Sequence, residues 1–443
     1  MYVTNLRVES VRLLADQDIS FASAPGQPRM WTVFLGDNGA CKTTLLQTIA
    51  FAVNGEGLPI SSDFDSTWLV RKNSPLCRIQ VEVDGGADPD EPGRVAPTYD
   101  WEIAGDASGF GAGLGDGAGH GDGTGSGRGG QRGQRPGGYS PSGVKTLWRD
   151  NGNLPRIAFL AAFGAQRTLP QPGETYSPPA MRDFERARGI FAKRHRLLAT
   201  DFYKLLRDQG ERQALQFTEA LDRVLRTASD EAALVPRLAG IERRGRDGVQ
   251  DLDQLLYTSR FKFMAGGSEY KLESYNLSDG YQSTIAWVAE LIGQYALEHG
   301  AVAAPEDMQG VVLLDEIDLH LHPSWQCRLV PILKKVFPKM QFIVTTHSPL
   351  VLTGFDAHEI VRLEFGTDGL VHARTGQIET GLMDATEVLD EYFGVLAQEN
   401  PELLRLRARW AELAGHSART PEQEGELAML KSRLAPYYRG RGE

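Results

Sequence analysis

Apolar residues recur at every second position in some parts of the chain and at every third or fourth position in others, so strands and helices are both expected. Alternation over residues 3–13, followed by Ile19 and Phe21, predicts a pair of strands near the N-terminus. Other short runs predict strands at 31–35, 78–84, 157–163, 260–264, 310–314, 340–345 and 359–365. Helical spacing begins near residue 42 and extends over about 279–297 and 324–337. This mixture predicts an α/β fold.

Two segments interrupt the pattern. Residues 105–138 hold 16 glycines in 34 positions and almost no large apolar residue. Such a composition cannot bury enough surface to offset its ordering entropy, so it predicts a disordered tether within a surface hairpin whose strands are 98–103 and 144–148. Residues 179–255 are rich in Arg and helical in pattern throughout, which predicts an inserted helical subdomain. The predicted division places two halves of the main domain at 1–104 and 256–367, return strands at 139–178 and a helical tail at 368–443.

The composition narrows the class of protein. The 443 residues include 47 Lys and Arg against 58 Asp and Glu, a net charge of −11, which argues against coating nucleic acid by bulk charge. The three cysteines form no closely spaced pair, so reduced thiols in a cytoplasm are expected. The N-terminus has the pattern of a strand and not of a signal peptide, and no run of apolar residues is long enough to span a membrane. We therefore expect a soluble, cytoplasmic protein without a membrane partner.

The first candidate site lies between the strand at 31–35 and the helix that follows it. Residues 36–43 read Gly-Asp-Asn-Gly-Ala-Cys-Lys-Thr and match the phosphate-binding pattern G-x-x-x-x-G-K-[ST], except that Cys41 replaces the second glycine. Backbone N–H groups and the helix dipole surround phosphate oxygens in such a loop, Lys42 would reach the β- and γ-phosphates, and Thr43 would ligate Mg²⁺. The predicted nucleotide-binding residues here are Gly36, Asp37, Asn38, Gly39, Ala40, Cys41, Lys42, Thr43 and Thr44.

The second candidate site follows the apolar run at 311–314, which ends in Asp315 and Glu316. A buried parallel strand delivers such carboxylates to its C-terminal edge, where ligands bind in open α/β sheets. Asp315 is the candidate ligand for Mg²⁺, and Glu316 is the candidate general base that polarises the attacking water. Two solvated acids at an ordinary strand end are the alternative.

Two further motifs flank these carboxylates. The sequence Leu-Ser-Asp-Gly-Tyr-Gln at 277–282 opens a long helix and predicts a second phosphate-binding helix N-terminus, with a plain Ser278 cap as the alternative. The sequence Thr-Thr-His-Ser-Pro at 345–349 places His347 at the end of a strand, where a sensor of the γ-phosphate would lie.

In this order, the four motifs resemble the Walker A, signature, Walker B with D-loop, and His-switch motifs of ABC-class ATPases. The nearest group comprises the stand-alone AAA-type ATP-binding proteins related to RecF, SMC and OLD-family ATPases. The resemblance implies a P-loop ATPase head with a mixed N-terminal sheet, a parallel core sheet and an inserted helical subdomain. It covers about residues 1–65 and 256–365.

The resemblance also implies how the site is assembled. Two ATP molecules would lie between two heads, and Ser278 and Gly280 of each head would contact the nucleotide held by its partner. Gln166, which follows a strand, would be the Q-loop glutamine that contacts Mg²⁺ and water. The implied assembly is a homodimer that uses ATP and Mg²⁺.

Residue 41 departs from the family pattern. A side chain at this position is expected to crowd the β-phosphate, with weaker binding or slower turnover as the result, and neutral drift is the alternative. A thiol at a helix N-terminus beside Lys42 is also expected to have a lowered pKa and to be reactive. After the catalytic acids, Asp318, His320 and His322 are compatible with a metal site, although a structural or dimer-contact role is favoured.

The chain lacks several parts of its relatives. No sustained heptads indicate a long SMC coiled coil, and the residues after His347 contain no pattern typical of a Toprim nuclease. Three hypotheses stay open. The first is an ATP-driven switch acting on a separate effector, such as a nuclease encoded beside it in an anti-phage system. The second is a RecF-like DNA-binding repair protein, and the third is an ATP-binding module with little turnover. The run 182–196 has six basic residues against two acids and, through the helical insertion, is the candidate nucleic-acid contact. A solvated helical face is the alternative.

Overall fold

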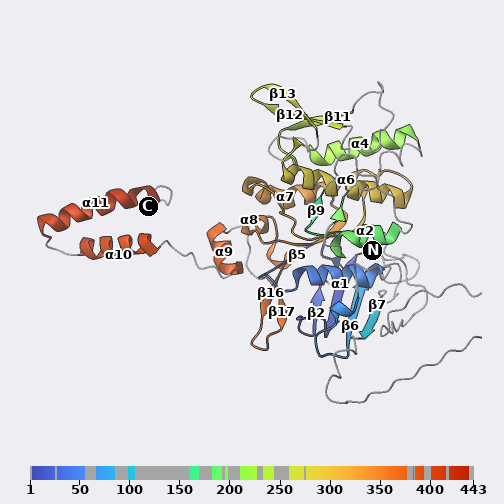
Figure 1. Cartoon of the computed structure of the whole chain (residues 1–443), viewed down its shortest axis with the longest axis horizontal. Coiled ribbons are helices and arrows are strands. Elements are labelled where there is room, and N and C mark those ends of the chain that lie inside the picture. Colours follow the sequence, from blue (N-terminus) through green and yellow to red (C-terminus); the bar gives the residue numbers. More distant parts are fainter. Residues whose placement is uncertain are drawn as a thin grey trace, which may run out of the picture. The chain divides into compact units, whose positions relative to one another are not determined.

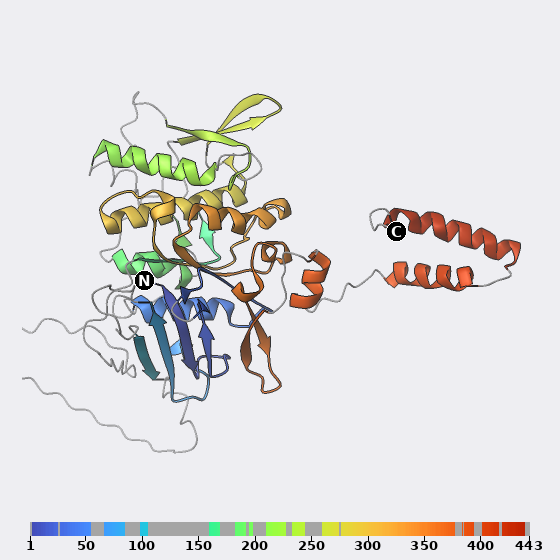
Figure 2. The same cartoon turned by 180° about the vertical axis from the view of Figure 1, so that it is seen from behind.

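The computed structural model of the chain describes residues 2–24, 27–54, 66–84, 98–104, 159–168, 182–191, 195–197, 210–226, 233–243, 259–273, 276–376, 383, 385–393, 401–415 and 419–438. Two compact units are present, Met1–Leu382 and Met383–Glu443. The first unit contains all the motifs introduced above, and Figures 1 and 2 show it from opposite sides.

A six-stranded sheet forms the centre of the first unit, in the order β17–β16–β5–β15–β14–β8. Neighbouring strands are parallel except β17, which runs antiparallel to β16. The strands are β5 (Trp31–Gly36), β8 (Leu160–Phe163), β14 (Gly310–Leu314), β15 (Met340–Thr345), β16 (Ile360–Phe365) and β17 (Val371–Thr375). Every residue of β14 and β15 is buried, as in parallel strands that are covered on both faces. The segments that follow the parallel strands leave the sheet at one common edge.

A second, antiparallel sheet is built mainly from the N-terminal part of the chain, in the order β2–β1–β6–β7. Its strands are β1 (Val3–Glu9), β2 (Gln17–Ser20), β6 (Leu76–Val83) and β7 (Thr98–Ala104), and the short pair β3 (Ala22–Ala24) and β4 (Gln27–Pro28) follows β2. In β6 buried positions alternate with more exposed ones, so one face of this sheet is apolar.

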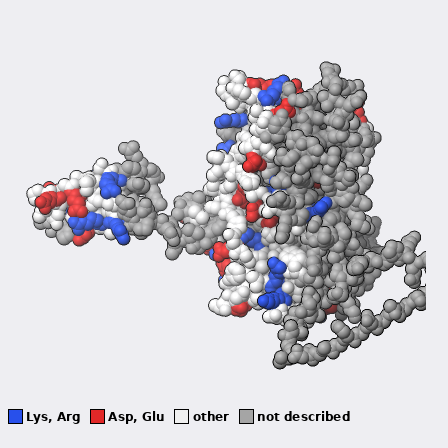
Figure 3. All heavy atoms as spheres, viewed as in Figure 1, with Lys and Arg blue, Asp and Glu red and all other residues white. Residues whose placement is uncertain are grey.

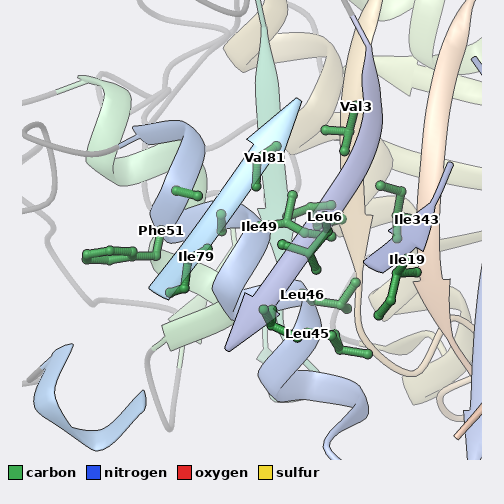
Figure 4. Packing of buried hydrophobic residues seen from close by; sticks show 14 of the residues in the cluster. Val3, Leu6, Ile19, Leu45, Leu46, Ile49, Phe51, Ile79, Val81 and Ile343 are labelled. Carbon is green, nitrogen blue, oxygen red and sulfur yellow. The ribbon is translucent and has the colours of Figure 1, made fainter. Parts of the chain in front are cut away.

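Helix α1 (Lys42–Asn54) lies between the two sheets and contacts strands of both. Figure 4 shows Leu46 and Ile49 of this helix gathered in one cluster with Leu6 of β1 and Ile343 of β15. All four side chains are fully buried in one apolar cluster. Burial of such a side chain contributes about 1.5–3 kcal/mol, so the packing fixes the position of the N-terminus of α1.

Helix α6 covers another part of the core. It packs against β8, β9 and α4, and it is buried along most of its 21 residues. Within the described residues no helix is both long enough and apolar enough to cross a membrane. The remaining elements of the first unit are α2 (Arg182–Phe191), β9 (Arg167–Thr168), β10 (His195–Arg196), α4 (Glu211–Leu225), α6 (Asp279–His299), α7 (Pro323–Val336), α8 (Pro349–Leu352) and the 3₁₀ turns η2 (Ser66–Leu69), η5 (Pro305–Asp307) and η6 (Ala357–Glu359).

The segment 179–255 is not helical throughout, so that part of the prediction is wrong. Strand β11 (Leu238–Arg243) lies within it and pairs with β12 (Ser259–Ala265). Strand β12 in turn pairs with β13 (Ser268–Glu273) through a turn at Gly266 and Gly267, whose φ angles are +58° and +79°. Long-range pairing decides the structure of β11, because its own six residues fit a helix or a strand. Helix α2, also in this segment, packs on α1 and β8.

The predicted helical tail begins too early. Residues 371–375 form β17, because an antiparallel partner, β16, is available at the edge of the core sheet. The second unit contains α9 (Ala385–Phe393), α10 (Pro401–Gly415) and α11 (Pro421–Tyr438). The domain division stays a prediction, and the tether at 105–138 and the strand at 144–148 lie outside the described residues.

Candidate functional site

The phosphate-binding loop connects β5 to α1, as the motif predicts. Gly36 packs so closely that a Cβ there would lie 2.5 Å from the carbonyl oxygen of Leu363, so only glycine fits without a backbone shift. Lys42 is buried, and its Nζ donates hydrogen bonds to the carbonyl oxygens of Gly36 (2.6 Å) and Asp37 (2.9 Å). Burial lowers the pKa of Lys42, and Asp315 opposes the shift. The ammonium group is therefore held within the loop.

The other residues of the phosphate-binding loop differ in how exposed they are. Asp37, Asn38 and Gly39 are exposed, whereas Ala40 and Thr44 are buried and belong to the support of the loop. Because only backbone N–H groups are needed to surround a phosphate, exposed side chains at the first three positions are compatible with the predicted role.

The structure contradicts the pKa that the sequence predicts for Cys41. Its φ is +61°, a left-handed conformation that favours glycine, which explains why the phosphate-binding pattern has glycine at this position. The side chain is half-buried and packs against the apolar cluster around α1. Burial raises the pKa of the thiol and outweighs the lowering effects of hydrogen bonds and of Arg12, so the predicted lowered pKa is wrong. The helix N-terminus does not produce a reactive thiolate here.

The carboxylate of Asp315 connects the loop to the core sheet. It is buried, its Oδ2 accepts a hydrogen bond from Thr43 Oγ1 at 2.8 Å, and its Oδ1 accepts one from Thr345 Oγ1 at 2.6 Å. The structure therefore brings together the two predicted metal ligands, which come from α1 and from the end of β14. A hydroxyl and a carboxylate at this spacing form an oxygen donor set of the kind that Mg²⁺ prefers.

Glu316 follows directly and turns away from the strand. Its φ is +48°, which is rare for a residue with a side chain, and it is partly exposed. Its N–H donates to Thr345 Oγ1 at 2.8 Å, so one threonine hydroxyl contacts both acids. This turn directs the chain out of the sheet at the edge where the phosphate-binding loop lies.

Arg167 lies outside the four sequence motifs. Its side chain is buried and donates to the carbonyl oxygens of Gly164 (3.1 Å), Asp315 (2.6 Å) and Glu316 (2.8 Å). Burial lowers the pKa of Arg167 to about 10, although three nearby carboxylates oppose the shift, and the guanidinium stays charged at neutral pH. The only sequence signal was its position next to Gln166, just after an apolar strand.

Gln166 and His347 lie at the same sheet edge, after β8 and β15, and both are exposed. Ser278 occupies the N-cap position of α6, is exposed, and makes no capping hydrogen bond with its side chain. Gly280 is buried, and a Cβ there would lie 2.4 Å from the carbonyl oxygen of His320. The predicted roles of these four residues stay predictions.

The segment after Glu316 has structural contacts that account for its polar residues. Asp318 accepts a hydrogen bond from Thr346, and the ring of His322 caps α7 through Ser324. Asp318, His320 and His322 do not form a metal-ligand cluster. Within the described part of the chain, the group whose ligand atoms lie close enough together is Asp356, His358 and Glu359. In that group Glu359 pairs with Lys334 at 2.6 Å.

Within the basic run at 182–196, Arg186 is buried, pairs with Glu298 at 2.5 Å and lies over the ring of Phe159. On the face drawn in Figure 3, the basic and acidic side chains of the described residues are interspersed. Most of the other basic side chains of the run lie outside the described residues, so the candidate nucleic-acid contact stays a prediction.

The parallel core sheet, the loop between β5 and α1, and the carboxylates after β14 define the class of this site as that of a P-loop ATPase domain. Residues 164–353 match a family described as "AAA domain, putative AbiEii toxin, Type IV TA system". Residues 164–353, less than half of the chain, are thus similar to an AAA-type ATPase domain.

Three curated relatives are similar over shorter stretches. Septu protein PtuA of Bacillus mycoides (strain KBAB4) is 35% identical over 171 residues, which is 34% of this chain and 23% of the relative. Retron Vc95 probable ATPase of Vibrio cholerae is 39% identical over 116 residues (25% and 22%), and Retron Ec83 probable ATPase of Escherichia coli is 46% identical over 90 residues (20% and 17%). The aligned part of the chain spans less than a quarter of the length of each.

Solved structures with a similar fold include an SMC head bound to the C-winged helix domain of ScpA. It has a TM-score of 0.48 and 14% identity and covers 86% of this chain and 100% of the other. The SMC head domain from Thermotoga maritima has a TM-score of 0.42 and 13% identity, with coverage of 85% and 100%. The fold class rests on the strand order and the phosphate-binding loop of this chain.

Proposed function

We propose that this protein binds ATP with Mg²⁺ and hydrolyses it at the interface of a homodimer, and that the cycle drives a conformational switch. Lys42 would bind the β- and γ-phosphates, and Glu316 would accept the proton of the attacking water as general base. His347 would contact the γ-phosphate, and Gln166 would orient the water.

The observation that carries this proposal is the hydrogen-bonded chain from Thr43 through Asp315 to Thr345 and on to the N–H of Glu316. It joins three segments that are far apart in the sequence and sets a hydroxyl, a metal-binding carboxylate and a candidate base at one sheet edge. A strand end with two solvated acids would not need a buried Asp315 with both carboxylate oxygens occupied.

Thr43 and Asp315 would hold the metal ion. Their oxygen atoms are 2.8 Å apart, and Mg²⁺ is bound in such sites by one or two protein oxygens together with phosphate oxygens and water. When bound, the ion would neutralise charge that develops on the phosphates. The residues of this chain would orient the nucleotide and accept the proton.

The dimer follows from the signature motif. Ser278 is exposed at the N-terminus of a 21-residue helix and makes no capping hydrogen bond, so its hydroxyl and the first N–H groups of α6 are available to an anion. We assign this anion to the γ-phosphate of an ATP molecule held by the partner subunit, in line with the resemblance to ABC-class heads.

The switch would act on a separate effector protein, such as a nuclease, in a DNA-related or defence process. Two relatives are named probable ATPases, which supports the hydrolytic part. A RecF-like role in DNA repair is the alternative.

The test is steady-state hydrolysis of Mg²⁺-ATP by the full chain and by Glu316→Gln, with Glu364→Gln as the matched control on β16. We expect loss of turnover of about 100-fold or more in Glu316→Gln, unchanged ATP affinity, and normal turnover in the control. Equal turnover in Glu316→Gln and the unaltered protein would refute the assignment of the base. Binding without turnover in the unaltered protein, with turnover appearing in Cys41→Gly, would favour the binding-module hypothesis.

A further inference from the structure

The guanidinium of Arg167 is surrounded by main-chain oxygens. Besides the carbonyl oxygens of Gly164, Asp315 and Glu316, its Nε approaches Ser283 Oγ at 3.4 Å. The side chain is 7% exposed, so water cannot replace these partners. A planar guanidinium can donate in several fixed directions at once, and a lysine ammonium cannot reproduce this arrangement.

The contacts of Arg167 join three elements that the motifs treat separately. Gly164 follows β8, Asp315 and Glu316 follow β14, and Ser283 lies at the start of the second turn of α6, three residues after Gly280. This arginine therefore connects the Q-loop segment, the carboxylates and the signature helix.

Glu316 needs such support because its backbone is left-handed, with φ at +48°. The backbone N–H and the carbonyl oxygen of Glu316 are both hydrogen-bonded to side chains. Thr345 Oγ1 accepts from the N–H, and Arg167 donates to the carbonyl oxygen. The carbonyl oxygen of Glu316 also accepts a hydrogen bond from the N–H of Leu319 at 3.1 Å. Loss of the Arg167 contact would leave that backbone bond in place, but the peptide after Glu316, and the carboxylate with it, would be held less tightly.

A second contact joins the same helix to the same turn. Gly280 allows α6 to approach the carbonyl oxygen of His320 so closely that a Cβ would lie 2.4 Å away. His320 itself has a φ of +61°. The first two turns of α6 thus contact the segment that follows Glu316 directly, through Gly280, and contact Glu316 through Arg167.

We propose that Arg167 is a positioning residue that holds Glu316 in its productive orientation and ties that orientation to the N-terminal turns of α6. The proposal rests on the proposed ATPase function. Engagement of Ser278 by the nucleotide of the partner subunit would then act on the general base through a rigid connection. Arg167 itself contacts main chain and one serine, and the reacting atoms are contacted by its neighbours.

The test compares Arg167→Lys with the unaltered full-length protein and with Arg78→Lys, an exposed arginine of β6, as the matched control. We expect kcat for Mg²⁺-ATP to fall by about 10- to 100-fold in Arg167→Lys, because a misplaced general base loses most of its effect. The KM and Kd for ATP should change by less than about threefold, since Lys42 and the phosphate-binding loop are not touched. Arg78→Lys should leave all of these values unchanged.

Several results would overturn the proposal. A kcat within twofold of the unaltered protein would do so, and so would equal losses of kcat and ATP affinity, which indicate a merely structural role. If the unaltered protein shows no hydrolysis, the proposed function fails, and hydrogen exchange then decides the positioning role. Arg167→Lys should increase amide exchange in both 314–320 and 279–285, and unchanged exchange in either segment would overturn the connection.

Discussion

Thr345 offers a direct test of how the two acids are held. Its hydroxyl donates to Asp315 Oδ1 at 2.6 Å and accepts from the N–H of Glu316 at 2.8 Å, and the residue is fully buried. Thr345→Val keeps the shape of the side chain but removes both bonds. Thr345→Ser keeps the hydroxyl and removes one methyl group, so it is the matched control.

The magnitude follows from the two partners that lose a bond. A hydrogen bond to a charged group contributes about 1.5–3 kcal/mol and a neutral one about 1 kcal/mol, so Thr345→Val should lower the free energy of unfolding by about 3 kcal/mol. The lost methyl group in Thr345→Ser should lower it by about 1 kcal/mol. For a unit of this size one kcal/mol corresponds to about 1–2 °C, so the Val variant should lose about 3–6 °C in Tm.

Differential scanning calorimetry measures these shifts, and the rate of Mg²⁺-ATP hydrolysis measures their effect on the acids. Turnover should fall by about tenfold in Thr345→Val, because Asp315 and Glu316 lose their common partner, and should stay close to normal in Thr345→Ser. Equal Tm and turnover in the two variants would refute the reasoning, since it would show that the hydroxyl fixes neither carboxylate.

Gly280→Ala should lower the free energy of unfolding by about 1–3 kcal/mol, because the new Cβ meets a backbone carbonyl. Gly425→Ala in α11, with no atom near its Cβ, should instead raise local helix stability by about 0.5–1 kcal/mol. Chemical denaturation of each variant measures both changes. Arg186→Gln should lower the free energy of unfolding by about 1–2 kcal/mol through loss of its partly buried ion pair with Glu298, and an unchanged denaturation midpoint would contradict this role. In a Cys327→Ser background, alkylation of Cys41 should be slow at neutral pH and should accelerate as the pH rises through the raised pKa of its thiol. Bound ATP should slow the alkylation. Fast labelling at pH 7, or equal labelling with and without ATP, would contradict burial of the thiol beside the nucleotide.

The parts of the fold that the sequence predicted are those with strong local signals. The run at 310–314 is short, wholly apolar and followed by two acids, and it is β14 at the predicted bounds. The helix after the phosphate-binding loop begins at Lys42, where the motif requires it. Burial on both faces of a parallel strand and the fixed link from loop to helix are local constraints, so they are visible in a single sequence.

The parts that were missed depend on contacts between distant residues. Strand β11 exists because β12 is available as a partner, and β17 exists because β16 offers a sheet edge. Arg167 contacts carbonyl oxygens nearly 150 positions further along the chain, and main-chain acceptors leave no pattern in side-chain identity. The lowered thiol pKa predicted for Cys41 is wrong because packing determines how far the thiol is buried, and the position of Cys41 at the helix N-terminus does not reveal that packing.

The proposed dimer holds ATP between two copies of the chain and requires Glu316 for its hydrolysis. Sedimentation velocity of full-length Glu316→Gln, with and without Mg²⁺-ATP, tests it most directly, with Ser278→Arg in the same background as the control. We expect a monomer without nucleotide, a stable dimer with Mg²⁺-ATP, and loss of that dimer in the control, because the signature helix could no longer contact the phosphate of the partner subunit. A Glu316→Gln protein that binds ATP and stays monomeric would contradict it.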